Sequence, residues 1–221
     1  LRFGVHTPTG DLESEPDEVR ACQLTREELE AVLPGFVGPS MQLPPMYSAV
    51  KVNGQPLYKA ARAGREVERS PRAIEIDSIA CTGPGEQPNE WRVAVTCSKG
   101  TYIRVLVEDI AAKLGTIAVM SALRRTASGD FTLAMAHPLP AILQAAEQGQ
   151  AEALLLGVDE VFGQLTRLDA DDFLYDRLFH GAPTRLHRPD GVYRVYHDTA
   201  FLGLAEVQGG YIRVKKLFCE R

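Results

Sequence analysis

The sequence predicts an α+β fold, and three observations support this. Residues 91–97 alternate apolar and polar side chains, which is the period of a half-buried strand. Residues 103–114 then repeat apolar side chains at the three- and four-residue spacing of one helix face, and Gly115 supplies a helix stop. Several short apolar runs between residues 192 and 214 predict a β-rich C-terminal segment.

Two features are predicted ahead of this strand–helix pair. Thr25–Leu29 has the pattern of a capping box, which opens a short helix that Pro34 and Gly35 end. We expect residues 39–51 to form an extended loop leading into a strand, because Pro44 and Pro45 restrict the residues before them to extended geometry.

A turn and a second strand follow. Asn53–Gly54 predicts a tight turn, and the residues after it predict one or two helical turns that end near Gly64. Residues 73–79 alternate in strand fashion, and a loop at 83–89 separates them from 91–97. These two strands are therefore predicted to pair in antiparallel fashion.

The C-terminal part predicts a helical stretch and then a small sheet or barrel. Pro138–Pro140 interrupts the chain, and residues 141–156, rich in Ala, Leu and Gln, predict a helix. The predicted strands are 192–196, 201–205 and 211–214. We accordingly predict one domain at residues 1–163 and a β-rich module at residues 164–221.

Composition excludes several classes of protein. A chain of 221 residues with 45% hydrophobic content can bury a core, and no apolar run reaches the roughly 18 residues of a membrane span. No secretory leader opens the sequence, so we expect a cytoplasmic protein without a membrane partner. The five histidines lack ligand spacing, and so do the cysteines, Cys22, Cys81, Cys97 and Cys219. We therefore expect free thiols and no metal site.

The charge of the chain is unevenly distributed. The net charge is −5, yet residues 46–72 hold six basic and two acidic side chains, and residues 96–126 hold five and two. Phosphate contacts act over about 10 Å at ordinary salt, so local basic clusters can bind a polyanion despite an acidic total. Each cluster taken alone is equally compatible with a solvated face.

The junction between the strand and the helix carries a cation. With Thr101 as the predicted N-cap, Arg104 falls at the third helical position, where a capping box places Glu or Gln and the helix dipole disfavours positive charge. This misplacement favours an anionic partner for Arg104. The alternative is a surface ion pair with Glu108, four residues on, worth about a few tenths of a kcal/mol.

Three stretches resemble one known family. Ser98–Arg104 with the helix that follows, the run from Pro44 through Lys51 to Arg72, and Leu123–Thr126 are similar, in this order, to motifs of the TruB-type tRNA pseudouridine synthases. The opening, with Thr7, Thr9 and Asp11, resembles the Thr-rich turn of that family. The resemblance covers about residues 1 to 135.

This resemblance implies a fold, an activity and a site. The fold would be the mixed or antiparallel sheet of pseudouridine synthases with flanking helices, and residues 164–221 would be a PUA-like RNA-binding module. The reaction would convert a uridine in the T loop of tRNA, at position 55, to pseudouridine without a cofactor. Arg104 would hold a catalytic Asp ionised, while Tyr102 and Leu123 would line the target-base pocket.

Residues 39–72 would form an RNA-contacting insertion that binds the T arm. Aromatic rings interleaved with cations suit looped RNA, whose bases stack on them. The implied RNA-binding residues are Tyr47, Lys51, Tyr58, Arg62, Arg69, Lys99, Arg124 and Arg125. We expect a monomer.

The sequence also departs from the family. The Gly-x-Leu-Asp-Pro stretch that carries the catalytic Asp is absent from the 221 residues, and residues 116–119 lack the usual Gly-Ala-His run. With Leu1 as the first residue, we expect a chain that lacks its N-terminal part and is catalytically incomplete by itself. A non-catalytic tRNA-binding or RNA-folding module is the main alternative, and an unrelated α+β protein is a third.

Overall fold

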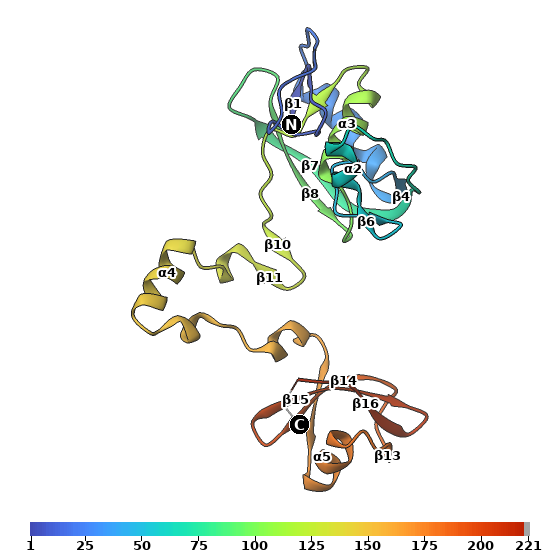
Figure 1. Cartoon of the computed structure of the whole chain (residues 1–221), viewed down its shortest axis with the longest axis vertical. Helices are drawn as coiled ribbons and strands as arrows, with labels where there is room; N and C mark the ends of the chain where they lie inside the picture. Colours follow the sequence, from blue (N-terminus) through green and yellow to red (C-terminus); the bar gives the residue numbers. More distant parts are fainter. Residues whose placement is uncertain (219–221) are drawn as a thin grey trace. The chain divides into compact units, whose positions relative to one another are not determined.

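The computed structural model describes residues 1–218 and divides into two compact units, one from Leu1 to Arg124 and one from Arg125 onward. Figure 1 shows both units, with the first in blue to green and the second in yellow to red. The α+β class is as predicted, because both units combine helices with mainly antiparallel sheets. The predicted boundary after residue 163 remains a prediction.

A three-stranded antiparallel sheet organises the first unit. The long strand β7 (Arg72–Pro84) lies between β4 (Gly38–Gln42) and β8 (Trp91–Cys97). The predicted pairing of residues 73–79 with 91–97 is confirmed, with Ile76 opposite Cys97. The expectation of a loop from residue 39 was wrong at its start, because residues 38–42 pair along β7 as a strand.

Two helices cover this sheet. The helix α1 (Arg26–Val32) continues into the 3₁₀ turn η1 (Leu33–Phe36), and α3 (Ile103–Lys113) follows β8 (Figure 1). Their apolar faces meet β7 in one hydrophobic cluster. The side chains buried there include Leu29, Leu33, Ile76, Leu106, Val107 and Ile110. A packed core thus fixes the start of α3, where Arg104 lies.

The start of α3 differs from the prediction by one residue. The N-cap is Tyr102, whose side chain makes no capping hydrogen bond within residues 1–218, whereas the Thr101 hydroxyl donates to the Ser98 carbonyl at 3.0 Å. Arg104 is therefore the second helical residue rather than the third. The helix end is as predicted, with Gly115 at a φ of 72° just after it.

A small hairpin and a short helix follow the loop after β4. Strands β5 (Lys51–Val52) and β6 (Gln55–Pro56) pair across Asn53 and Gly54, whose φ angles are 51° and 80°. Positive φ at both central residues is the geometry of a type I′ turn, so the turn prediction is confirmed. The helix α2 (Leu57–Arg62) then ends before Gly64, as expected.

Short strands complete the first unit. Strand β1 (Arg2–Phe3) pairs with β9 (Ala118–Val119), and β2 (Val5–His6) pairs with β3 (Glu18–Val19). A parallel bridge joins Asp11 to Met120, so the segment after β2 runs beside the segment after α3. This arrangement brings the Thr-rich turn to the helix that carries Arg104.

The second unit contains a five-stranded sheet in the order β12, β14, β15, β16, β13. The three predicted strands are confirmed with longer bounds. The strands are β12 (Thr166–Ala170), β13 (Thr184–Arg185), β14 (Gly191–His197), β15 (Ala200–Gln208) and β16 (Tyr211–Leu217). The helix α5 (Asp172–Phe179) was not predicted, although Asp171 caps it by accepting from the Leu174 amide at 2.7 Å.

The segment before that sheet contains several short elements. These are β10 (Ala127–Ser128), β11 (Phe131–Thr132), η2 (Leu133–Met135), α4 (Leu139–Glu147), η3 (Ala151–Leu154) and η4 (Val158–Phe162). The predicted helix 141–156 is shorter because Gly149, at a φ of 68°, follows its end. Pro140 lies in the first turn of α4, where its missing N–H costs nothing, so it opens the helix rather than interrupting the chain.

Three absences hold for the described part of the chain, residues 1–218. No helix there is long and apolar enough to cross a membrane. No group of three or more His, Cys, Asp or Glu side chains there could hold a metal ion. Cys22, Cys81 and Cys97 are free thiols, and Cys219 lies outside the described residues.

The capping box of α1 gives a stability prediction. Thr25 accepts from the Glu28 amide at 3.2 Å, and Glu28 accepts from the Thr25 amide at 2.9 Å. Thr25→Ala should lower the free energy of unfolding of the first unit by about 1 kcal/mol, because an N–H group at the start of α1 loses its partner. Trp91, the single tryptophan, reports this unfolding in urea. Thr25→Ser is the control, and equal losses in both variants would contradict the capping role.

Candidate active site

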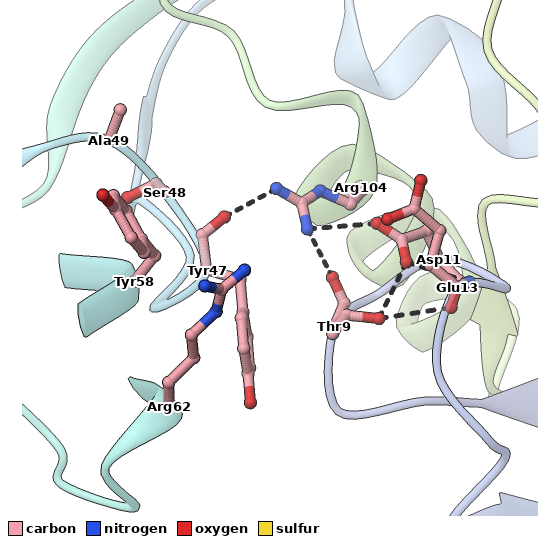
Figure 2. A pocket seen from close by; sticks show the side chains of 9 residues that line it. All are labelled: Thr9, Asp11, Glu13, Tyr47, Ser48, Ala49, Tyr58, Arg62 and Arg104. Atoms are coloured by element: carbon pink, nitrogen blue, oxygen red, sulfur yellow. Dashed lines mark hydrogen bonds and ion pairs between the residues drawn. The ribbon is translucent and has the colours of Figure 1, made fainter. Parts of the chain in front are cut away.

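A pocket of about 480 Å³ opens in the first unit between the Thr-rich turn, the loop after β4 and α3. Figure 2 shows the side chains around it, with Arg104 between the turn that carries Thr9 and the loop that carries Tyr47. The lining residues are Thr9, Asp11, Glu13, Tyr47, Ser48, Ala49, Tyr58, Arg62 and Arg104. Four residues predicted from the sequence as site residues are therefore brought together, namely Tyr47, Tyr58, Arg62 and Arg104.

The Arg104 guanidinium is held by three acceptors from two separate segments (Figure 2). Nη1 donates to the Thr9 carbonyl at 2.7 Å and to Asp11 Oδ2 at 3.2 Å. Nη2 donates to the Tyr47 carbonyl at 2.7 Å. The Arg104 and Asp11 side chains are only 20% and 16% exposed, so this ion pair is partly shielded from water.

The anionic partner that the sequence predicted for Arg104 is thus present as Asp11. The alternative pair with Glu108 is not the one formed, since the ion pair of Arg104 is with Asp11 at 3.2 Å. An arginine has five N–H donors, and Arg104 commits three hydrogen bonds to the described residues. Two donors therefore remain to bind a further acceptor, such as a second carboxylate or a bound nucleotide.

The Thr-rich turn presents Asp11 through its own hydrogen bonds. The Thr7 hydroxyl donates to the Asp11 carbonyl at 2.6 Å, and the Thr9 hydroxyl donates to Asp11 Oδ1 at 2.8 Å. Gly10 has a φ of 75°, and a Cβ there would lie 3.0 Å from Glu108 Oε1 and 3.3 Å from Arg104 Cβ. The turn therefore packs directly on α3, and a side chain at Gly10 would push it away.

The loop after β4 is fixed at several points. Gln42, at the end of β4, hydrogen-bonds the backbone of Tyr102, and Arg69 Nη1 donates to the Pro44 carbonyl at 3.1 Å. The Tyr58 amide donates to the Ser48 carbonyl at 3.0 Å, which joins the loop to α2. The position of Tyr47 in the pocket therefore depends on anchors on both sides of it.

Comparisons with known proteins identify the family of the chain. Residues 1–103 match the model of the TruB family pseudouridylate synthase N-terminal domain, and residues 104–163 match that of the tRNA pseudouridylate synthase B C-terminal domain. Among curated relatives, tRNA pseudouridine synthase B of Stutzerimonas stutzeri is 41% identical over 98% of this chain and 73% of its own length. The same-named protein of Chromobacterium violaceum is 41% identical over 95% and 69%.

The chain belongs to the TruB family of pseudouridylate synthases.

Solved structures show the fold of this TruB family chain. A chain of a Cbf5–Nop10–Gar1 complex matches 90% of it with a TM-score of 0.66 and 20% sequence identity. A chain of an H/ACA RNP bound to a substrate RNA containing 2′-deoxyuridine matches 90% with a TM-score of 0.65 and 18% identity. The TruB family chain spans 64% and 63% of these two chains, so the match describes its fold.

Other predicted site residues of the TruB family chain lie outside the lining of the pocket. Tyr102 is the N-cap of α3 and is half-buried, and Leu123 is 60% exposed. Their place beside a target base stays a prediction. Lys51, Lys99, Arg124 and Arg125 are exposed cations, as RNA-contacting side chains must be.

Arg69 differs from the other predicted RNA-binding cations. Its side chain is only 16% exposed, with Nη1 on the Pro44 carbonyl and Nη2 at 3.1 Å from Glu66. Arg62, by contrast, is exposed and lies over the Tyr58 ring, with its Cζ 5.5 Å from the ring centroid. The two predictions remain, but the structure assigns Arg69 a role in holding the loop and leaves Arg62 open to solvent.

The sequence pointed to Arg104 but not to its bond with Asp11. The two residues are 93 positions apart, and no local pattern joins them. The one available signal was the resemblance of Thr7, Thr9 and Asp11 to a Thr-rich turn of the family. Gln42 and Gly10 carried no chemical signal in the sequence, and the packing of the turn and the loop reveals them.

The carboxyl group of Glu108 lies behind this turn. Burial raises the pKa of Glu108 most strongly, the nearby His6 and Arg104 side chains lower it, and the neighbouring charge of Asp109 raises it. The folded chain therefore holds this proton more tightly than the unfolded chain does. Stability from this group is complete below the ordinary Glu pKa and falls as the pH rises through the raised value.

Glu108→Gln should remove this pH dependence. The free energy of unfolding is measured in urea by Trp91 fluorescence. The value for the variant minus the value for the wild type should increase as the pH rises from about 4 to about 7. Glu68→Gln, at an exposed site, controls for the loss of one negative charge. A difference between Glu108→Gln and the wild type that stays constant over this range would contradict the effect of burial.

Proposed function

We propose that the protein isomerises uridine to pseudouridine in the T loop of tRNA, at position 55, with the pocket around Arg104 as its active site. The observation that carries this proposal is a largely buried guanidinium with two donors that make no hydrogen bond to the described residues, in a pocket of about 480 Å³ that two tyrosines also line. The curated relatives, named tRNA pseudouridine synthase B, support the choice of tRNA as the substrate.

The proposed reaction is balanced without an oxidant or reductant. The bond from uracil N1 to the sugar C1′ breaks, the base turns over, and a bond from C5 to C1′ forms. C5 releases its proton, and N1 takes one up. The protein therefore has to bind, orient and stabilise charge, which are the tasks that preorganised donors and ion pairs perform.

Arg104 fits the task of charge stabilisation. A guanidinium within a few ångströms of a carboxylate favours the ionised form of that carboxylate and fixes its direction. Arg104 Nη1 donates to Asp11 Oδ2 at 3.2 Å, so the guanidinium already binds one carboxylate. We assign the two remaining donors to the catalytic Asp of the family, which acts on the nucleotide. Because no Gly-x-Leu-Asp-Pro stretch occurs in the 221 residues, we expect no turnover from these residues alone and turnover from the full-length protein.

The tyrosines and basic side chains fit a flipped base. A uridine must leave its stack before its glycosidic bond can be reached, which costs about a few kcal/mol that the pocket must offset. Tyr47 and Tyr58 line the pocket (Figure 2), and Arg62 Cζ lies 5.5 Å from the centroid of the Tyr58 ring. Base stacking on such rings is worth roughly 1–3 kcal/mol per base. The basic segment 46–72 would then bind the T-arm backbone.

Arg104 variants test the enzymatic role. In the full-length protein, Arg104→Ala should lower kcat for a T-arm RNA by about 100-fold or more, the usual loss for one preorganised donor group. Arg104→Lys should stay severely impaired, because it keeps the charge but not the forked geometry that spans Thr9, Asp11 and Tyr47. Release of tritium from C5-labelled uridine measures the turnover.

Arg26→Ala is the matched control for the Arg104 variants. Arg26 is exposed on α1 and pairs with Glu30 at 2.7 Å, so its loss should leave turnover unchanged. Near-normal turnover of both Arg104 variants would remove Arg104 from the mechanism. RNA binding without turnover by the full-length wild type would favour the alternative of a non-catalytic RNA-binding or RNA-folding module.

The contrast between Arg62 and Arg69 tests the RNA-binding surface. Arg62→Ala should weaken T-arm binding, because the exposed Arg62 loses a phosphate contact. The magnitude of the slope of log affinity against log salt concentration should fall by about 1. Arg69→Ala should leave the slope closer to that of the wild type, since its guanidinium is engaged by Pro44 and Glu66. Fluorescence anisotropy at several salt concentrations measures both. Equal slopes for Arg62→Ala and the wild type would exclude a phosphate contact at Arg62.

A further inference from the structure

Gln42 makes an unusual pair of hydrogen bonds at the strand–helix junction. Its side chain is buried, with 5% exposed, and both of its polar atoms contact the backbone of Tyr102, 60 residues away. The Tyr102 amide donates to Gln42 Oε1 at 2.8 Å, and Gln42 Nε2 donates to the Tyr102 carbonyl at 3.2 Å. The amide of Gln42 thus acts as the pairing partner that a neighbouring strand would otherwise supply.

This pair compensates for the weak cap of α3. Tyr102 is the N-cap, and its side chain makes no capping hydrogen bond within the described chain. Its carbonyl also accepts the first helical bond, from the Leu106 amide at 3.1 Å, so both lone pairs of that oxygen are used. Replacing Gln42 by an apolar residue would leave the Tyr102 N–H without an acceptor and would remove one donor from the Tyr102 carbonyl. An unpaired polar group at this partly buried junction is costly.

A second bridge joins the same two segments five residues further along the loop. Arg104, which lies two residues after Tyr102, donates through Nη2 to the Tyr47 carbonyl at 2.7 Å. Residues 42–47 and 102–104 are thus tied at both ends, by Gln42 to Tyr102 and by Tyr47 to Arg104. We call this arrangement the 42–47/102–104 frame.

The frame is stiff between its two ties. Pro44 and Pro45 fix their own φ angles and restrict the residues before them. The Pro44 carbonyl accepts from Arg69 Nη1 at 3.1 Å, which holds the middle of the loop. A change at the Gln42 end is therefore transmitted along a short, restrained path to the Tyr47 carbonyl and to the guanidinium of Arg104.

We propose that Gln42 is a positioning residue, which sets the placement of Arg104 and Tyr47 in the pocket through the backbone of Tyr102. This inference rests on the proposed function, because it assigns Gln42 a part in that reaction. Gln42 is not among the residues that line the pocket, so it acts through its neighbours and not on the substrate. Its effect should fall on kcat and leave RNA binding nearly intact.

Gln42→Met is the first test, in the full-length protein. Met has nearly the same length and shape but neither a donor nor an acceptor of comparable strength, so both bonds to Tyr102 are lost. We expect kcat to fall by about 10- to 100-fold, the range that a misplacement of about 1 Å can cause, with KM within about threefold of the wild type. Gln87→Met is the matched control, because Gln87 is exposed in the loop after β7, and its kcat should not change.

Gln42→Glu separates positioning from general stability. A protonated carboxyl group has one donor and one acceptor and can restore both bonds to Tyr102, whereas an ionised one accepts only and faces the Tyr102 carbonyl. Burial raises the pKa of a carboxyl group placed there. The ratio of the kcat of Gln42→Glu to that of the wild type should therefore rise as the pH falls from about 8 to about 5, while the ratio for Gln42→Met stays flat.

Hydrogen exchange of the Tyr102 amide supplies a readout that does not need turnover. Exchange should be at least about tenfold faster in Gln42→Met than in the wild type, because the amide loses its acceptor. If the wild type converts uridine and Gln42→Met matches its kcat, the inference is wrong. If the wild type does not convert uridine, the proposed function fails. In that case, unchanged exchange of the Tyr102 amide in Gln42→Met would still show by itself that Gln42 does not hold the Tyr102 backbone. If Gln42→Met does not fold, a pH-independent ratio for Gln42→Glu overturns the inference.

Discussion

The pocket of the first unit depends on one set of interactions, the hydrogen bonds around the Arg104 guanidinium. A single planar cation joins α3 to the Thr-rich turn through Thr9 and Asp11 and to the loop after β4 through Tyr47. A charge that is 80% covered needs acceptors on several sides, because an unpaired buried charge is far more costly than an unpaired neutral group. The need to satisfy this cation explains why segments distant in sequence converge at one pocket.

Much of the scaffold followed from local rules. The strand at 91–97, the helix from 103 and its end at Gly115 appear in the structure because their periodicity and stop residue agree with the tertiary fold. The role of Arg104 was visible as a conflict, since a cation near a helix N-terminus opposes the helix dipole. In this chain, the unfavourable position of Arg104 near a helix N-terminus indicated the site more directly than the regular strand and helix patterns did.

Tertiary contacts decided what the sequence could not. Thr101 was the better N-cap by side-chain chemistry, but the pairing of Gln42 with the Tyr102 backbone moves the helix start by one residue. The strand at 38–42 contains Gly38 and Pro39, which hide its strand character, yet it is an edge strand, where a proline is tolerated. The bond from Arg104 to Asp11 spans 93 positions and depends on the fold as a whole.

The way in which Arg104 is anchored bears on how this pocket can diverge. Two of its three acceptors are main-chain carbonyls, those of Thr9 and Tyr47, and every residue type offers the same carbonyl. The side chain of Tyr47 can therefore change while its carbonyl still accepts from Arg104, provided that the backbone path is preserved. The side chain of Thr9 is less free to change, because its hydroxyl also orients Asp11. Side chains that line the pocket can then change, and substrate preference with them, while the Arg104 guanidinium keeps its position.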